Sequence, residues 1–516
     1  MATLDKQQKD KGLLLRGLSA VERVGNRLPH PVTIFALLTL LVILLSHLFA
    51  LMGVTVQFEG INPETMKTET QTVSVESLLV PDGIRYMVTS IVENFTTFVA
   101  LGPVLVAMIG VGVAERSGYL AMLLKRIVIK APKRLVTPTV VLMGIMSNIA
   151  ASVGYVVLVP LGAIIFLGFK RHPLAGMAAA FAGVSGGYSA NLLIGTNDPI
   201  LAGISTEAAR ILNANVVVDP TANWYFMIVS TFILVFIGTW VTDKIVEPRL
   251  GPYREPISAD IERISQREKR AFRWANLSLL VVVLIIALSI IPSDGVLRGE
   301  GGSVVNSPFI QSIIVFMMVV FLIPGLVYGA LTGVIKNDKD AAGMMSDSLA
   351  SMAGFILLIF ISAQFVAFFN HTHLGTLLSV KGAEFLQASG FVGIPLMVTF
   401  ILLTAVINLF IAADSAKWAI MAPIFIPMFM QLGYSPELTQ VAYRIGDSTT
   451  NIIAPLMPFF ALIVAFAQKY DRKSGIGTVV SLMLPYSLLF LLFWIVLLII
   501  WYFLGLPLGP GAPLFM

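Results

Sequence analysis

Cysteine is absent from this chain of 516 residues, and charged side chains make up only 12% of it. Without a thiol the protein cannot form disulfides, thiolate metal sites, cysteine-ligated iron–sulfur clusters or a cysteine nucleophile. The five histidines leave little basis for proposing a metal site. No His-Glu-x-x-His motif and no Walker A sequence occurs, so the sequence supports neither a metalloprotease nor an ATP-driven pump.

Apolar residues are correspondingly abundant, at 57% of the chain. A polypeptide of that composition is not a soluble enzyme. At about 20 apolar residues per crossing it can form roughly ten membrane elements. The excess of 34 Lys+Arg over 29 Asp+Glu is typical of basic cytoplasmic loops, and no basic strip with interleaved aromatics indicates nucleic-acid binding. We therefore predict an all-α polytopic membrane protein without a nucleic-acid partner.

Loop charges predict how the chain is oriented. Basic residues precede the first span, at 33–53, whereas the following residues 54–93 are mainly acidic. Because Lys and Arg in short loops are retained on the cytoplasmic side, we expect a cytoplasmic N-terminus. Eight further spans are expected at about 95–114, 174–194, 224–241, 277–291, 310–331, 350–369, 436–467 and 479–503.

Two apolar stretches fit neither one ordinary crossing nor two. Residues 135–169 are flanked by basic clusters at both ends and are interrupted by Ser147, Asn148, Ser152 and Gly154. Residues 391–432 are interrupted at 412–417, and the alternation of sides requires them to start and finish outside. We predict a re-entrant helical hairpin at each stretch, in addition to about nine full spans. Irregular backbone at membrane depth needs protein or a water-filled cavity around it, so each tip marks a candidate site.

The two hairpins belong to an internal repeat, with units at 135–196 and 391–467. A shift of 263 positions aligns six pairs, and a three-residue slip then places 191–193 on 451–453. The pairs are Ser152 with Ser415, Tyr155 with Trp418, Pro160 with Pro423, Pro173 with Pro436, Gly183 with Gly446 and Ser185 with Ser448. Each unit contains a hairpin, a span that starts at proline, and a second break, at 186–187 or 447–448. The hairpins enter from opposite sides, so the repeat is inverted; chance identity between apolar stretches is the alternative.

Five ionisable side chains are expected at membrane depth, where each costs about 2.5–3.5 kcal/mol to insert. Arg444 and Asp447 lie three residues apart on one predicted helix face. They could pair with each other, or Arg444 could bind a substrate carboxylate while Asp447 exchanges a proton or cation. Asp414 and Lys417 repeat this spacing, which favours a solvated salt bridge in an open vestibule. Asp198, directly before a proline, fits an Asx turn.

Uncharged polar residues near the predicted breaks form a second set of candidates. Asn148, Asn191, Asn408 and Asn451 lie in apolar surroundings. Together they form a candidate cation site, with oxygen ligands for Na⁺, although a single buried Asn more often joins two helices. Trp418 beside the second tip could stack on an aromatic substrate ring, or could be an ordinary core tryptophan.

Several strings distributed along the chain are specific enough to suggest a family. They are VERVGNRLPHP at 21–31, RHPLAG at 171–176, the run 186–204, NWYFM at 223–227, YRIGDS at 443–448 and LPLGPG at 506–511. In these strings the sequence resembles the AbgT family over nearly its whole length. The resemblance implies a dimeric bacterial inner-membrane transporter of p-aminobenzoyl-glutamate with nine spans and two inverted hairpins, in a family with members that export sulfonamide drugs.

The resemblance also implies which residues act in transport. The family's functional positions would fall on Asp198, Ser415, Trp418, Pro436, Arg444, Asp447 and Pro455. The hairpin units would form a transport domain, and the remaining spans would form a dimerising scaffold.

We expect a secondary transporter that is not an enzyme, with H⁺ or Na⁺ as coupling ion and no other cofactor. Its partners would be membrane lipid, a second copy of the chain, and a small molecule with aromatic and carboxylate groups. Asp447 and Asp198 would couple export to proton entry. The alternatives are Na⁺-coupled uptake at the Asn-rich breaks and a passive channel. A membrane enzyme is more remote, because Ser185, in a Gly-x-Ser-x-Gly match, lies inside a predicted span.

Overall fold

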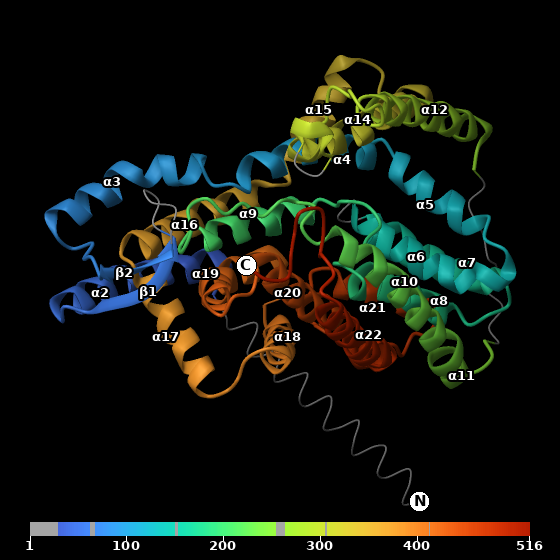
Figure 1. Ribbon diagram of the computed structural model, residues 1–516. Helices are drawn as coiled ribbons and strands as arrows, with labels where there is room; N and C mark the ends of the chain where they lie inside the picture. The colour runs from blue at the N-terminus through green and yellow to red at the C-terminus, as the bar shows by residue number, and fades with distance from the viewer. Residues whose placement is uncertain (1–28, 62–67, 150–152, 254–263, 305–306, 412) are drawn as a thin grey trace, which may run out of the picture.

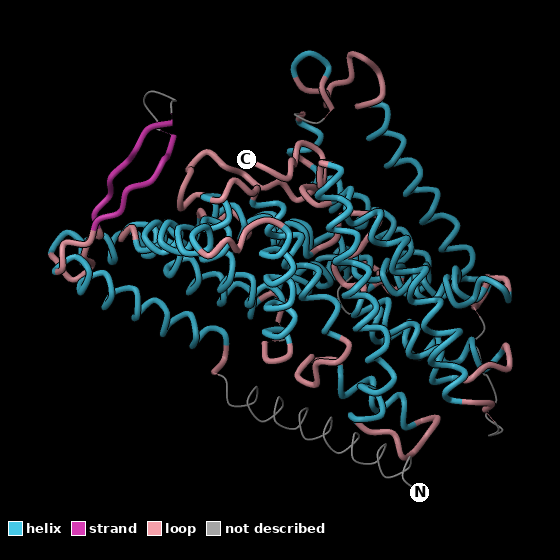
Figure 2. The backbone as a smooth tube through the Cα atoms, turned by 60° about the horizontal axis from the view of Figure 1, so that its bottom comes forward, coloured by secondary structure: helices cyan, strands magenta, loops and turns pink. Residues whose placement is uncertain are grey.

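A computed structural model describes residues 29–61, 68–149, 153–253, 264–304, 307–411 and 413–516. The described chain is helical (Figure 1), apart from an antiparallel pair of strands, β1 (Thr55–Ile61) and β2 (Thr68–Ser74). The strands form a ribbon that projects from the helical body (Figure 2). They lie in the acidic segment 54–93, where the sequence predicted only a loop. The predicted all-α polytopic class is otherwise confirmed.

Seven helical segments are long and apolar enough to cross a membrane in the described residues. They are α2 (Pro31–Leu51), α3 (Pro81–Thr96) with α4 (Leu101–Arg116), α10 (Trp224–Val241) with its extension through η5 (Thr242–Val246) and α11 (Glu247–Leu250), α12 (Gln266–Leu288), α14 (Ile313–Thr332), α16 (Ala353–His371) and α22 (Ile476–Leu504). Each overlaps one predicted span. The second begins earlier than predicted, at Pro81, and is interrupted at 97–100, where Gly203 lies against Ala100.

The other two predicted spans are broken helices. Residues 174–194 form α8 (Pro173–Phe181) and a π-helical turn, η4 (Ala182–Gly186), after which the helix ends as predicted. The span predicted for 436–467 forms α20 (Pro436–Asn451) and α21 (Phe460–Gln468), so it is broken as predicted, although the break lies after 451 and not at 447–448. Pro455 and Pro458 in the link have no N–H to continue a helix. In the described residues, the seven long segments together with these two broken ones agree with the predicted count of about nine spans.

Each predicted hairpin consists of two α-helical arms that are not continuous with each other. The first comprises α6 (Val136–Met146), η2 (Ser147–Ile149), η3 (Gly154–Leu158) and α7 (Val159–Gly168). Ser152, assigned to its tip, lies outside the described residues. The second comprises α18 (Ile394–Asn408) and α19 (Asp414–Gln431). In space, α7 packs on α8 and α18 packs on α20, so each hairpin lies against the broken span of its own repeat unit.

Shorter helices, which the sequence analysis did not identify, complete the fold. They are α5 (Tyr119–Ile129), η1 (Lys133–Leu135), α9 (Asn197–Ala209), η6 (Glu300–Gly302), α13 (Pro308–Gln311), α15 (Asp338–Ala350) and α17 (Leu374–Ala388). The hairpins, α8, α10, α20 and α22 pack together in one body, which extends from the middle of the view to its right-hand side (Figure 1). Helices α4, α12, α14 and α15 form one peripheral group, and α2, α3, α16 and α17 form another.

Loops that the charge pattern assigned to the same side contact one another. Among the basic segments, Arg171 pairs with Asp243 at 2.6 Å and also with Glu247. Among the acidic segments, the Glu76 N–H donates to the Thr372 carbonyl at 3.2 Å. These contacts agree with the predicted division of the loops between two sides. Which of the two sides faces the cytoplasm remains a prediction.

Candidate functional site

A polar, buried helix, α20, carries four of the candidate residues: Pro436, Arg444, Asp447 and Asn451. Its first residue is Pro436, whose fixed φ suits a first helical turn, and the Ser435 hydroxyl accepts the Leu438 N–H at 3.1 Å. Residues 438–451 are all buried, although this stretch includes Arg444 and Asp447. Charges enclosed in this way need partners, and other helices supply them.

Arg444 pairs with Asp198, which lies directly after the first repeat unit. Its Nη2 donates to Asp198 Oδ1 at 2.6 Å, and the two side chains are only 3% and 4% exposed. Asp198 lies in the first turn of α9 and also accepts the Gly195 N–H at 2.6 Å. This bond runs three residues back along the chain and not two forward, so the predicted Asx turn is wrong. Arg444 Nη1 lies 3.2 Å from the Met227 sulfur, and Nε has no hydrogen-bond partner among the described residues.

Asp447 pairs with Lys417 of the second hairpin, so the predicted Arg444–Asp447 pair is wrong. Lys417 Nζ lies 2.5 Å from Asp447 Oδ1, and both side chains are 1% exposed. The predicted solvated bridge between Asp414 and Lys417 in an open vestibule is wrong too. Because α19 packs against α20, Lys417 is enclosed, and spacing along one helix did not decide the pairing.

Asp414 is half-buried at the start of α19, where it contacts the first repeat unit. The Tyr188 hydroxyl donates to Asp414 Oδ2 at 3.2 Å, and the Tyr443 hydroxyl donates to the Asp414 carbonyl at 2.6 Å. Sequence reasoning missed Tyr188. Its position directly after the glycine pair at 186–187, where the helix ends, is the signal that could have identified it.

Trp418 is fully buried and packs inside the protein. Its ring centroid lies 4.3 Å from that of Tyr443, and its Nε1 donates to Ser205 Oγ at 3.0 Å. Ser205 in turn donates to Gln440 Oε1 at 2.6 Å. The interpretation of Trp418 as an ordinary core tryptophan therefore fits this conformation. Ser205 and Gln440, which sequence reasoning did not identify, tie α9 and α19 to α20.

The remaining family positions lie at helix ends. Ser415 is half-buried in the first turn of α19. Pro436 starts α20, and Pro455 is half-buried in the link between α20 and α21. These residues shape the broken elements that present the charged groups.

The two candidate asparagines of the first repeat unit differ from the two of the second unit in their hydrogen bonding. Asn408 Nδ2 donates to Asn451 Oδ1 at 2.8 Å and to the Asp447 carbonyl at 2.7 Å. In the first unit, Asn191 Nδ2 lies 3.4 Å from the Ile145 carbonyl. The amide nitrogen and oxygen of buried Asn148 have no hydrogen-bond partner among the described residues. Asn148 is therefore the amide best able to accept an added ligand.

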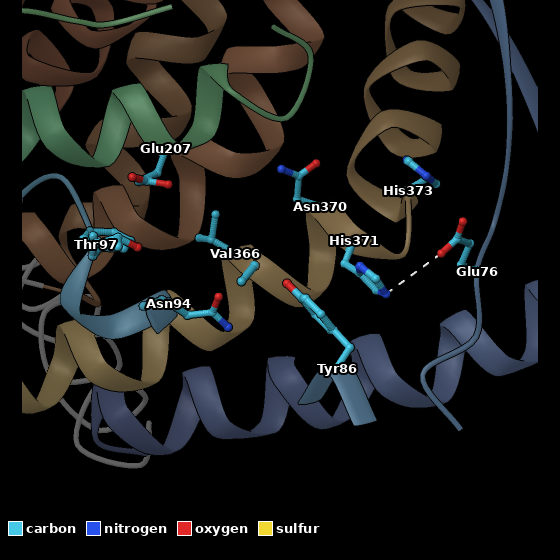
Figure 3. A pocket seen from close by; sticks show the side chains of 12 residues that line it. Glu76, Tyr86, Asn94, Thr97, Glu207, Val366, Asn370, His371 and His373 are labelled. Atoms are coloured by element: carbon cyan, nitrogen blue, oxygen red, sulfur yellow. Dashed lines mark ion pairs between the residues drawn. The ribbon is translucent and has the colours of Figure 1, made fainter. Parts of the chain in front are cut away.

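A separate polar cavity of about 590 Å³ lies near the ends of α3, α9 and α16 (Figure 3). Its lining includes Glu76, Tyr86, Glu207, His371 and His373. The His371 ring stacks on Tyr86, with 3.7 Å between centroids, and lies 3.9 Å from the Glu76 carboxylate. No cluster of three potential His or carboxylate metal ligands occurs in the described residues. No residue of the Arg444–Asp198 pair or the Lys417–Asp447 pair lines this cavity. Those two buried pairs, and not the cavity, contain the charged groups suited to binding a carboxylate.

Known proteins of closely similar sequence and structure exist. Residues 16–516 match the model of the AbgT putative transporter family. The p-aminobenzoyl-glutamate transport protein of Escherichia coli (strain K12) is 39% identical over 492 residues, which cover 95% of each chain.

Two solved structures share the fold over nearly the full length. The YdaH transporter of Alcanivorax borkumensis is 45% identical with a TM-score of 0.88, covering 93% of this chain and 100% of its own. MtrF of Neisseria gonorrhoeae, described as illuminating a class of antimetabolite efflux pumps, is 48% identical with a TM-score of 0.90, covering 96% of this chain and 100% of its own.

Proposed function

The chain belongs to the AbgT family of transporters, and from that premise we propose that it exports p-aminobenzoyl-glutamate and sulfonamide-like antimetabolites in exchange for protons. The similarity to the E. coli transport protein supports the first substrate, and the similarity to MtrF supports antimetabolite efflux. The proposal places a polytopic transporter, not an enzyme, in the bacterial inner membrane with its N-terminus in the cytoplasm.

One observation carries this proposal: a buried ion pair, Arg444–Asp198, joins α20 of the second repeat unit at 2.6 Å to α9, the helix that directly follows the first unit. An arginine fork recognises carboxylates well, and Arg444 Nε has no partner among the described residues. A substrate carboxylate that replaces Asp198 keeps the guanidinium paired. An unpaired buried charge would cost about 3–5 kcal/mol, so this exchange favours carboxylate substrates.

Protons enter the same scheme through the aspartates. A proton that adds to a carboxylate oxygen of Asp447 or Asp198 removes its negative charge and weakens the bridge to Lys417 or Arg444. Each proton moving down the gradient supplies about 2.3 kcal/mol per 100 mV. One or two protons therefore provide enough free energy to accumulate substrate against a gradient.

Na⁺-coupled uptake is the second candidate, and Asn148 favours it. Its buried amide oxygen has no hydrogen-bond partner among the described residues and lies at a helical break, where backbone carbonyls supply further oxygen ligands. The candidate cation site would then consist of Asn148 with Asn191, because Asn408 and Asn451 already hydrogen-bond each other.

The repeat units 135–196 and 391–467 form the transport domain in this proposal, and the peripheral spans form a dimerising scaffold. Helices α2 and α12 present large exposed apolar side chains, among them Leu37, Leu44, Leu280 and Ile285. Such surfaces need membrane lipid or a second copy of the chain to cover them. Chemical crosslinking in native membranes, with a single cysteine introduced on α12, tests for the homodimer.

Reconstituted liposomes test transport and coupling. Uptake and release of labelled p-aminobenzoyl-glutamate are measured under an imposed pH gradient, with an equal Na⁺ gradient as the paired condition and protein-free liposomes as the blank. Asp447→Asn should lose proton-driven flux at every pH. Asp82→Asn, a change at a side chain that is 88% exposed, should behave like the parent.

The outcomes separate the candidates. Saturable flux driven by protons alone supports the exporter. Flux driven only by Na⁺ overturns proton coupling and supports uptake through Asn148. Flux that rises linearly with substrate and exceeds carrier turnover indicates a channel, and parental transport by Asp447→Asn at all pH values removes Asp447 from the coupling mechanism.

A further inference from the structure

Lys417 is bound as an inorganic cation would be. Its Nζ donates to Asn408 Oδ1, to Asp447 Oδ1 at 2.5 Å, and weakly to the Ile411 carbonyl at 3.5 Å. An ammonium has three N–H donors, so each can be directed at one of these oxygens. The side chain is 1% exposed, and the oxygens form an enclosed set of amide, carboxylate and backbone carbonyl.

The three oxygens come from the elements that build ion sites at broken membrane helices. Asn408 is the last residue of α18, Ile411 lies in the non-helical link that follows, and Asp447 projects from α20. A helix C-terminal end, an unwound carbonyl and a buried carboxylate are typical Na⁺ ligands in transporters. The second hairpin thus contains a cation site that the chain's own ammonium occupies.

In the first repeat unit, the sequence position that corresponds to Lys417 carries no ammonium group. A shift of 263 places Gly154 at the position of Lys417, and a shift of 260 places Asn148 at the position of Asn408. The amide of Asn148 has no partner among the described residues, whereas Asn408 bonds to Lys417 and Asn451. The presence of the lysine therefore coincides with a fully bonded asparagine, and its absence with an unbonded one.

We propose that Lys417 is a tethered cation that takes the place of a mobile coupling ion in the second repeat unit. The second unit then needs no Na⁺ to neutralise Asp447. Any ion that binds and leaves during transport acts on the first unit or as a proton on a carboxylate. This inference deepens the proposed function, because it assigns a positioning role to one residue of the same site.

Lys417→Ala tests the inference, because it removes the ammonium and leaves the oxygens in place. Thermal unfolding in detergent is measured in choline chloride, with Na⁺ or n-propylammonium added at constant ionic strength. Propylammonium replaces the atoms that the substitution removes. We expect Lys417→Ala to unfold at a lower temperature than the parent, and either small cation to raise the midpoint by several degrees in a saturable manner.

Matched variants set the baseline. Lys381→Ala removes an exposed lysine, with a side chain that is 59% exposed, and should unfold like the parent in every salt. Lys417→Ala combined with Asp447→Asn removes the charge that attracts the cation, so its midpoint should not respond to Na⁺ or propylammonium. If Lys417→Ala alone does not fold in choline, folding in Na⁺ or propylammonium is the expected result.

Flux in liposomes gives an independent reading. Lys417→Ala should transport at least tenfold more slowly than the parent, and propylammonium or Na⁺ should restore most of that loss. A Lys417→Ala protein whose stability and flux ignore both cations overturns the inference. If the cations stabilise this variant while the parent does not transport p-aminobenzoyl-glutamate, the inference stands and the proposed function fails.

Discussion

The two repeat units share a backbone arrangement but differ in how they are charged. In the first unit Asn148 is buried without a hydrogen-bond partner among the described residues, and a glycine, Gly154, stands opposite Lys417 in the repeat. In the second unit Asn408 contacts the Lys417 ammonium and Asn451. The two units thus present one neutral and one charged arrangement around the corresponding asparagine.

Close helix contacts show that the scaffolds correspond. A Cβ added at Gly183 would lie 2.3 Å from the Val141 carbonyl, and one added at Gly446 would lie 2.4 Å from the Ile401 carbonyl. In both units the glycine faces the first arm of the hairpin, α6 or α18. The two glycines correspond at a shift of 263 positions, whereas the residues that they contact, Val141 and Ile401, correspond at a shift of 260. The shift of 260 is also the one that relates 191–193 to 451–453. Each predicted unit therefore contains a glycine packed closely against the first arm of its hairpin.

The units differ also in where the broken span ends. In the first, η4 ends at Gly186, as predicted, and the chain continues without helix to Thr196. In the second, the break predicted at 447–448 is wrong, since α20 continues to Asn451. Asn408 binds the Asp447 carbonyl there and supports the extra turn.

Breaking the ion pair between α20 of the second unit and α9, which directly follows the first unit, should have the largest effect. Arg444→Met leaves Asp198 charged and buried, which should cost about 3–5 kcal/mol of stability. Adding Asp198→Asn should recover much of that loss, because no uncompensated charge remains. Thermal unfolding of both single variants and the double variant measures the coupling. Additive losses in the double variant would show that the 2.6 Å contact is not a stabilising pair.

Alanine at the paired asparagines should separate the units next. Asn408→Ala leaves Lys417 Nζ and the Asp447 carbonyl short of a partner, at about 1–3 kcal/mol for a buried unsatisfied group. Asn148→Ala breaks no hydrogen bond that the described structure contains, so its unfolding midpoint in choline should stay close to the parent's. A larger loss for Asn148→Ala than for Asn408→Ala would contradict the comparison.

The glycine contacts should respond alike in both units. Gly183→Ala and Gly446→Ala each force a methyl group into backbone less than 2.5 Å away, which should cost about 1–3 kcal/mol by overpacking. Gly343→Ala in α15 is the control, because nothing lies within 4 Å of the added carbon. It should be neutral or stabilising by about 0.5–1 kcal/mol. Clearly unequal losses at Gly183 and Gly446 would show that the repeat units are packed differently.

We expect the smallest effect from the N-caps of α8 and α20, the two helices of the repeat units that start at proline. His172 Nδ1 accepts the Leu174 N–H in α8, and Ser435, at the equivalent position of the repeat, caps α20. Burial, opposed by Glu247 and Asp471, lowers the pKa of His172 below 6.5. The neutral cap therefore stabilises the fold fully above that pH, and the contribution is lost as pH falls through the lower folded pKa.

Ser435→Ala should cost about 1 kcal/mol at every pH. His172→Asn keeps a cap that does not titrate, so it should flatten the dependence of the unfolding midpoint on pH between 5 and 7. Unfolding scans across that pH range measure both effects. A parental slope in His172→Asn would mean that another group titrates.

Much of the fold follows from the sequence because its cause is local. Apolar runs of about 20 residues must cross a membrane, and basic loops limit the orientation. Proline at 173 and 436 starts helices for the same steric reason in both units. The short helices α5, α9, α15 and α17 escaped prediction because their 11–15 residues are too few to span a membrane, and no local signal requires them.

The sequence alone determined which polar residues are costly to bury: Asp198, Lys417, Arg444 and Asp447 stand out by composition and position. Only the tertiary structure decided their pairing, because Arg444 meets a residue 246 positions away and Asp447 meets one 30 positions away. Residues three apart on α20 prefer partners on other helices, since burial makes each charge seek the nearest opposite charge in space. Spacing along the chain cannot specify that neighbour.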